Sequence, residues 1–148
     1  MNINFARIAL AAVVSWIVYL GVSFFIHSLI LREMYVQHLT SMRPEADQNA
    51  MLPVGFVFAL VGFFAFSYAY AKGYEGGSGT QEGLRFGVLV GIIICCFRII
   101  WDHMIWPVPL QLTAAWMVQY ILQFAMYGSV VGAIYKPAQK TVRAGVAI

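Results

Sequence analysis

Four long apolar runs, separated by shorter polar segments, dominate the pattern of hydrophobic and polar positions along this chain of 148 residues. Each run is long enough to cross the hydrocarbon core of a bilayer, which requires about 20 residues of helix. None alternates apolar with polar residues as a membrane β-strand would, and backbone groups in lipid must bond within their own segment. The pattern therefore predicts an all-α protein, a four-transmembrane-helix bundle that forms one integral membrane domain over residues 1–148. The predicted helices cover approximately residues 8–31, 52–71, 86–106 and 110–135.

The composition agrees with a membrane protein and leaves little room for a soluble module. Hydrophobic residues make up 61% of the chain and charged residues 10%, against about 25% charged residues in a typical soluble domain. The net charge of +3 is small and scattered, so nucleic acid is not an expected partner. The lipid bilayer is the expected partner, together with further copies of the chain or a larger membrane complex. No catalytic set of residues is recognisable, and an enzyme is therefore not favoured.

Lys and Arg are divided unequally between the two sides of the predicted membrane. With the N-terminus in the cytoplasm, six of the nine Lys and Arg residues fall inside and three outside. Because cytoplasmic loops carry an excess of these residues, we expect both termini to be cytoplasmic. The inner residues are Arg7, Lys72, Arg85, Lys136, Lys140 and Arg143, and the outer ones are Arg32, Arg43 and Arg98.

Small residues recur at helical spacing on the second and third predicted helices. A repeat of small residues every four positions lets two helix backbones approach closely in lipid. We expect the two stripes to meet across the short Gly-rich hairpin that joins these helices. They consist of Gly83, Gly87 and Gly91 on the third helix and of Ala65, Ala69 and Gly73 on the second.

Arg98 and Asp102 place two charges four residues apart within the third apolar run. Continued at about 100° per residue, the glycine stripe passes through both, so the pair is expected to face neighbouring helices. Counting from the middle of the run puts Arg98 only about 3 to 7 Å from the membrane centre. An unpaired arginine there costs about 2.5 to 3.5 kcal/mol, so Asp102 and acceptors from other helices are expected to bind it.

Polar residues of the first and fourth predicted helices fall in the same half of the membrane as this pair, at positions that share one face of each helix. Two interpretations of the cluster stay open. The residues are either a structural lock, whose interhelical hydrogen bonds contribute about 1 kcal/mol each, or a site for an anion, a polar headgroup or a moving proton. The candidate residues are Ser23, His27, Arg98, Asp102, Gln119 and Gln123.

Two glycine-rich segments carry a resemblance to known proteins. AYAKGYEGGSGTQEGLRFGVLVG and YGSVVGAIYKP resemble segments of small bacterial four-helix integral membrane proteins of unknown function. The resemblance covers most of the chain in layout and rests on glycine-rich packing motifs. It implies a multi-pass protein of the bacterial inner membrane, and it assigns no catalytic residue.

Three classes of function are compatible with these features. The first is a non-catalytic membrane component or accessory subunit, whose polar cluster binds an anion or a polar headgroup. The second is a small transporter or channel, although no helix has a Pro or Gly break near mid-membrane. The third is a haem-binding or redox protein, which needs two facing axial ligands. His27 could be one, whereas His103 points off the stripe and His38 lies outside the core, so no cofactor and no metal site are predicted.

Overall fold

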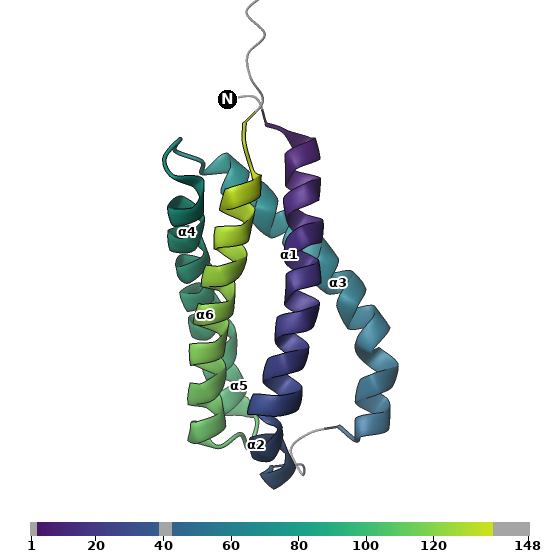
Figure 1. Cartoon of the computed structure of the whole chain (residues 1–148). Coiled ribbons are helices and arrows are strands. Elements are labelled where there is room, and N and C mark those ends of the chain that lie inside the picture. The colour runs from purple at the N-terminus through teal and green to yellow at the C-terminus, as the bar shows by residue number, and fades with distance from the viewer. Residues whose placement is uncertain (1–2, 39–42, 138–148) are drawn as a thin grey trace, which may run out of the picture.

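The computed structural model describes residues 3–38 and 43–137 as an all-α protein (Figure 1). Within this part of the chain, four helices are long and apolar enough to cross a membrane, and they pack as a bundle. The prediction of an all-α bundle with four spans is therefore confirmed. The spans cover Phe5–Ile30, Glu45–Lys72, Gly79–Ile105 and Leu110–Ile134.

Two of the four spans change from α-helix to a π turn, in which each backbone N–H bonds to the carbonyl five residues earlier. The first span consists of α1 (Phe5–Phe25) and the π turn η1 (Ile26–Ile30), and the short helix α2 (Arg32–Gln37) follows it. The third consists of α4 (Gly79–Ile94), the π turn η3 (Cys95–Ile99) and α5 (Ile100–Ile105). The second and fourth spans are the single helices α3 (Glu45–Lys72) and α6 (Leu110–Ile134).

The second span begins at Glu45, earlier than the predicted start near residue 52. Pro44 has an extended backbone and precedes the first turn of α3, which contains the acidic residues Glu45 and Asp47. Carboxylates are favourable at this position because the N-terminus of a helix carries partial positive charge. The polar residues that sequence reasoning assigned to a connection thus form the first turns of α3.

The two ends of the bundle differ in what they contain (Figure 1). The turn end holds the start of α1, the connection between α3 and α4, and the end of α6. The α2 end holds α2 and the connection between α5 and α6. These two names are used below without implying which side of a membrane each end faces.

At the turn end, one carboxylate organises the Gly-rich connection between α3 and α4. The two oxygens of Glu82 accept hydrogen bonds from the backbone N–H groups of Glu75 at 2.6 Å and Gly77 at 3.2 Å. The Tyr70 hydroxyl donates to the carbonyl oxygen of Gly79 at 3.1 Å. These bonds tie the end of α3 to the start of α4 and hold the hairpin closed.

α4 and α6 run side by side with their backbones in direct contact (Figure 1). A methyl group built on Gly91 would lie 2.8 Å from Cα of Ile121, and one built on Gly128 would lie 2.9 Å from Cα of Gly87. Both distances are shorter than real carbon atoms adopt. The glycines of the two helices therefore permit an approach that any side chain would prevent.

The partner of the α4 glycine stripe differs from the prediction. Gly83, Gly87 and Gly91 are buried against α6 and not against α3. The reason is that α6 carries glycines of its own opposite the stripe, whereas α3 turns phenylalanine and tyrosine side chains towards its neighbours. The small residues of α3 that were expected to meet the stripe are exposed, namely Ala65, Ala69 and Gly73.

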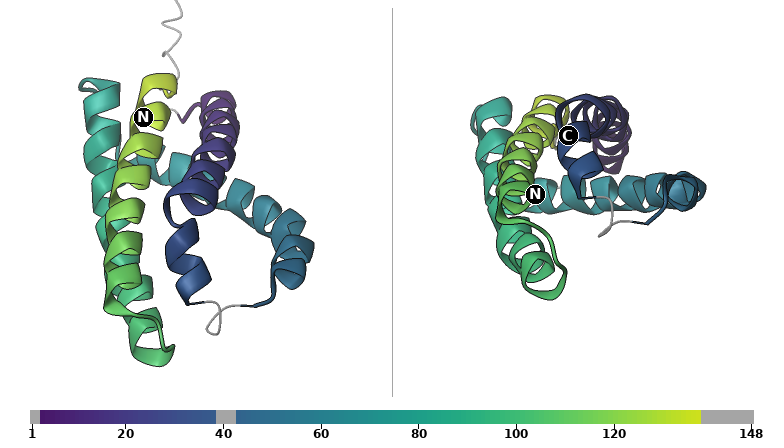
Figure 2. Two further views of the ribbon diagram at one scale, coloured as in Figure 1. Left: turned by 60° about the horizontal axis from the view of Figure 1, so that its bottom comes forward. Right: turned by 90° about the horizontal axis from the view of Figure 1, so that it is seen from below.

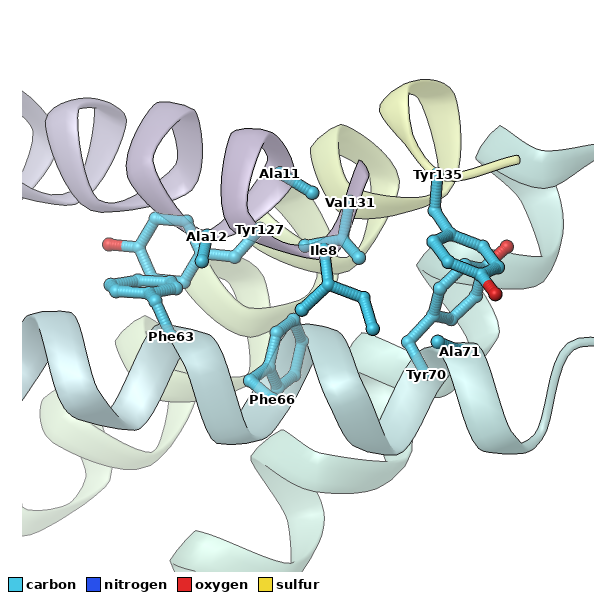
Figure 3. Packing of buried hydrophobic residues seen from close by; sticks show 10 residues of the cluster. All are labelled: Ile8, Ala11, Ala12, Phe63, Phe66, Tyr70, Ala71, Tyr127, Val131 and Tyr135. Atoms are coloured by element: carbon cyan, nitrogen blue, oxygen red, sulfur yellow. The ribbon is translucent and has the colours of Figure 1, made fainter. Parts of the chain in front are cut away.

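α1, α3 and α6 meet in an aromatic core towards the turn end, seen from close by in Figure 3. The rings of Phe63 and Tyr127 lie 5.1 Å apart at an interplanar angle of 83°. Such edge-to-face pairs contribute about 0.5 to 1.5 kcal/mol beyond the burial of their area. The buried residues of this core are Ile8, Ala11, Ala12, Phe63, Phe66, Tyr70, Ala71, Tyr127, Val131 and Tyr135.

Only the C-terminal half of α3 belongs to this core. Its five buried residues all lie between Phe63 and Ala71, whereas residues 49–58 are exposed. Figure 2 shows the N-terminal half of α3 leaving the other helices. The indole N–H of Trp16 in α1 donates to the carbonyl oxygen of Phe56 at 2.9 Å and holds α3 to α1 near the place where the two helices separate. The bundle is therefore more open at the α2 end than at the turn end.

Candidate functional site

A chain of hydrogen bonds joins α6 to η1 and α2 at the α2 end. The Nδ1 atom of His27 lies 2.6 Å from the Tyr35 hydroxyl, and its Nε2 atom lies 3.0 Å from the amide nitrogen of Gln119. Trp116 donates its indole N–H to the same hydroxyl at 3.0 Å. The Gln119 amide also donates to Oε1 of Gln123 at 3.4 Å. Three residues of the predicted cluster are thus in contact, together with two aromatic residues.

The donors and acceptors of this chain fit two arrangements of protons. An indole N–H can only donate, so the Tyr35 oxygen always accepts from Trp116. In the first arrangement Gln119 donates to Nε2 of His27, and the Nδ1–H group donates to Tyr35, whose own O–H is then free. In the second, Tyr35 donates to Nδ1 and the Nε2–H group donates to the Gln119 amide oxygen, which requires the side-chain amides of Gln119 and Gln123 to be turned over from the placement described above. A ligand that accepts a hydrogen bond from Tyr35 therefore favours the first arrangement.

Burial and a hydrogen bond act in opposite directions on the Tyr35 hydroxyl. Removal from water raises the pKa of this phenol above its ordinary value, and the hydrogen bond from Trp116 opposes the rise. A phenol is already neutral at pH 7 with its ordinary pKa of about 10, so the hydroxyl can donate to a ligand with or without this rise.

Two amide atoms at the buried end of the chain are left without a partner. Within residues 3–38 and 43–137, Oε1 of Gln119 and Nε2 of Gln123 form no hydrogen bond, although both side chains are buried. A buried polar group without a partner costs about 1 to 3 kcal/mol, and such groups are rare in native proteins. Within the same ranges the hydroxyls of Ser15, Ser67, Tyr127 and Tyr135 are unpaired as well, so the two amide atoms do not by themselves distinguish a binding site from a structural lock.

Arg98 and Asp102 form an ion pair, but Arg98 does not face α6. Its Nε atom lies 2.7 Å from Oδ2 of Asp102, and the Arg98 side chain is 72% exposed against 17% for Asp102. The other guanidinium nitrogens have no partner among the described residues. The expectation that Arg98 packs against neighbouring helices is therefore wrong.

The π turn η3 explains the different direction of Arg98. Extrapolation at about 100° per residue carried the glycine stripe to Ile94 and Arg98. Because a π turn contains an additional residue, the stripe keeps its four-residue spacing and continues through Cys95 and Ile99, which are buried. Arg98 is turned by about 100° from the α6 side towards open space.

That space is an open pocket of about 750 Å³ at the α2 end. Its walls come from η1, α2, the start of α3, the η3–α5 segment and α6. Both π turns contribute to it, and π turns inside helices are frequent at functional sites. The lining residues are His27, Ser28, Arg32, Tyr35, Val36, Glu45, Gln48, Asn49, Arg98, Ile99, Asp102, Trp116 and Tyr120.

The structure gathers most of the predicted cluster at this pocket and leaves one residue apart. Ser23 is half-buried, lies beside the Tyr127 hydroxyl and does not line the pocket. The lining residues among those predicted are His27, Arg98 and Asp102, with Gln119 and Gln123 joined to them through His27.

Tyr35 is the most important residue that sequence reasoning did not include. In a regular α-helix, eight residues after His27 would place Tyr35 about 80° off the face of the histidine. The additional residue in η1 removes this offset, and the two rings stack with their centroids 5.7 Å apart. Trp116 could have been found, because it lies three residues before Gln119 on the same face of α6.

These features define a small helical membrane protein with four spans and a polar pocket at one end. Among the described residues, no group of three or more His, Cys, Asp and Glu side chains could hold a metal ion. Comparison of the chain with protein-family models, with curated proteins and with solved structures gave no match. The function has to be inferred from the pocket itself.

Proposed function

We propose that this protein is a non-catalytic component of the bacterial inner membrane that binds the anionic headgroup of an amphiphile in the pocket. One observation carries the proposal. The guanidinium group of Arg98 is held at Nε by Asp102, and its remaining N–H groups are open to the pocket. Guanidinium groups bind phosphate and carboxylate oxygens through two parallel hydrogen bonds. Arg98 is therefore positioned to bind such an anion.

The depth of Arg98 supports a headgroup as the ligand. Arg98 lies seven residues before Ile105, the last residue of its span, which corresponds to about 10 Å at 1.5 Å per residue. An arginine inside the membrane costs free energy unless it is paired or reaches the interface. Asp102 binds only one of its five N–H donors. An anionic group that binds the others recovers part of this cost.

The neighbouring surface of α3 supports an amphiphile rather than a free anion. Glu45 and Gln48 lie at the pocket, and the next turns of the helix expose apolar side chains. Val54, Val57 and Phe58 are 53%, 62% and 72% exposed. A lipid bound by its headgroup would find an apolar surface for its acyl chains beside the pocket.

The α2 end, and with it the pocket, is proposed to face away from the cytoplasm. The excess of Lys and Arg at the turn end supports this orientation, although Lys140 and Arg143 lie outside the described residues. The test uses intact cells that produce the protein without its native cysteines. A membrane-impermeant thiol reagent should then label Asp47→Cys and not Ser78→Cys. Labelling of the cysteine at position 78 alone would reverse the orientation.

Binding is tested by native mass spectrometry of the purified protein with phosphate-containing lipids. The parent should retain lipid, and Arg98→Gln should lose most of it. Arg85→Gln is the matched control, because Arg85 is an exposed arginine of the same span that does not line the pocket. Equal retention by the parent and both variants would refute the proposal.

A double variant separates binding from a structural lock. Arg98→Met combined with Asp102→Leu removes both charges together, a replacement that often leaves stability unchanged. We expect the double variant to stay folded, as judged by its melting temperature in detergent, and to retain no more lipid than Arg98→Gln. A folded double variant that binds lipid like the parent would show that the pair acts as a lock only.

A small carrier is the second candidate, because helix geometry is interrupted around the pocket. The π turns η1 and η3 and the internal Pro53 all lie in helices that form its walls. Interrupted helices are common at transport sites. Movement of a labelled lipid across proteoliposomes that is lost in Arg98→Gln would favour the carrier, whereas binding without movement would favour the binding component.

The haem alternative gains no support from the pocket. An axial histidine needs a free ring nitrogen, and both nitrogens of His27 lie within hydrogen-bonding distance of protein groups. The Nδ1 atom of His103 lies 2.9 Å from the Val108 carbonyl oxygen and 3.1 Å from the Thr113 hydroxyl, and His103 does not line the pocket.

A further inference from the structure

Cationic and acceptor groups come from different walls of the pocket. η3 and α2 contribute the guanidinium groups of Arg98 and Arg32, whereas the start of α3 contributes Glu45 and Gln48. Gln48 uses its amide nitrogen to donate to the Arg43 carbonyl oxygen at 2.6 Å, which leaves its Oε1 atom as an acceptor. The pocket thus holds guanidinium donors on η3 and α2, and on α3 it holds a carboxylate and an amide oxygen that can accept.

The charges of the pocket balance. Two arginines, Arg32 and Arg98, stand against two carboxylates, Glu45 and Asp102. Within the described part of the chain, neither Arg32 nor Glu45 forms an ion pair, since the pair of Arg98 with Asp102 is the one present there. A simple anion would meet the uncompensated Glu45 carboxylate as well as the arginines. A ligand that carries both signs of charge would satisfy both walls.

We infer that the ligand of this pocket is a zwitterionic phosphate ester with a primary amine, such as the phosphoethanolamine headgroup of a membrane lipid. This inference rests on the proposed function and adds the chemical class of the headgroup. The phosphate binds Arg98 and Arg32, and the ammonium binds Glu45 and Gln48.

A primary ammonium fits the α3 wall because it has three N–H donors. The carboxylate of Glu45 and the amide oxygen of Gln48 are acceptors of the kind that such a group requires. A quaternary ammonium has no N–H group and is recognised by aromatic faces instead. The order along the membrane also agrees, since Arg98 lies about 10 Å inside the end of its span and Glu45 is the first residue of α3. The phosphate, to which the acyl chains are joined through glycerol, therefore lies deeper than the amine.

The experiment compares headgroups on identical short acyl chains. Purified protein in detergent is titrated with phosphoethanolamine, phosphoglycerol and phosphocholine lipids, and the Kd of each is measured by calorimetry. We expect the phosphoethanolamine lipid to bind about tenfold more tightly than the other two, because a hydrogen bond to a charged group contributes more than a neutral one. Glu45→Gln should abolish this preference and leave the binding of the phosphoglycerol lipid unchanged or stronger.

Asp47→Asn is the matched control for Glu45→Gln. Both carboxylates lie in the first turn of α3 and interact with the helix dipole, but Asp47 does not line the pocket. The headgroup preference should therefore survive in Asp47→Asn. Equal loss in both variants would mean that the carboxylate acts on the helix and not on the ligand, and would overturn the inference.

The remaining outcomes separate this inference from the proposed function. Equal, Arg98-dependent binding of all three lipids would overturn the inference and keep the proposed function. If the phosphocholine lipid binds as tightly as the phosphoethanolamine lipid, the claim that the amine binds through its N–H groups is refuted. If inorganic phosphate competes as strongly as the lipid, the ligand is a free anion, and the claim that the pocket binds a lipid is refuted. Binding of none of these probes would overturn both proposals.

Discussion

A single methyl group at Gly87 should weaken the contact between α4 and α6. A Cβ atom there would lie 2.7 Å from the carbonyl carbon of Phe124 and 3.0 Å from Cα of Ala125. Ordinary contacts begin near 3.4 Å, and the carbonyl oxygen of Phe124 would lie closer to the added atom than its carbon does, so the two backbones must separate by more than about 0.7 Å. Because both neighbours are backbone atoms, rotation of a side chain cannot relieve the overlap.

This separation reduces the dispersion attraction between the two helices. A gap of about 0.5 to 1 Å loses a quarter to a half of the attraction of each contact. Overpacking of a closely packed interior typically costs about 1 to 3 kcal/mol. We therefore expect Gly87→Ala to lower the free energy of unfolding by about 2 kcal/mol.

The measurement is unfolding in mixed micelles with increasing sodium dodecyl sulfate, followed by circular dichroism. Gly62→Ala is the matched control, since it makes the same change inside α3, where nothing lies within 4 Å of the added atom. Alanine favours helix over glycine by about 1 kcal/mol, so the control should be as stable as the parent or more stable. If the two variants unfold alike, close backbone contact is not what holds α4 to α6.

Three further substitutions test other contacts. Tyr35→Phe removes the hydroxyl that accepts from Trp116 and bonds to Nδ1 of His27, and it should lower the unfolding free energy by about 1 to 3 kcal/mol. An unchanged melting temperature would show that this chain of bonds does not stabilise the fold. Trp16→Phe removes the hydrogen bond to the Phe56 carbonyl, so backbone hydrogen exchange should become faster in residues 49–58 and stay the same in α6. A uniform change across the protein would contradict a local role of this bond. Glu82→Gln weakens two hydrogen bonds that close the Gly-rich turn, so a protease should cut this turn faster than in the parent. Equal cleavage rates in variant and parent would show that Glu82 does not hold the turn closed.

The spans could be predicted from the sequence because the bilayer fixes both the length and the composition of a crossing helix. The burial of the α4 glycines also follows from their spacing. Their partner does not, since small residues at the same spacing occur on α3 and on α6. The choice depends on which pair of helices can bring two glycine faces together over several turns. That is settled by the packing of the whole bundle, in which Gly128 and Gly132 of α6 lie opposite α4.

The candidate site was predictable where the helices are regular. Gln119 and Gln123 lie on one face of α6, and counting from the helix end places His27 at a matching depth. The direction of Arg98 and the inclusion of Tyr35 depend on η3 and η1, whose irregular hydrogen bonding has no marker in the sequence. The opening beside α3 was equally hidden, because residues 49–58 are as apolar as a packed helix would be although they pack against little.

A π turn has the same effect on a helix as the insertion of one residue that the helix absorbs without breaking. If residues 95–99 formed regular α-helix without loss of a residue, everything after them would rotate by about 100° about the helix axis and the arginine would point at α6. A chain that lacks the additional residue would instead form regular α-helix with its later residues facing as they do here, and its sequence would align with this one only across a gap of a single residue. The same holds for η1 and the residues that follow it. Whether the additional residue is absorbed as a π turn, and not the identity of the lining residues alone, therefore decides which way the arginine of a related chain faces.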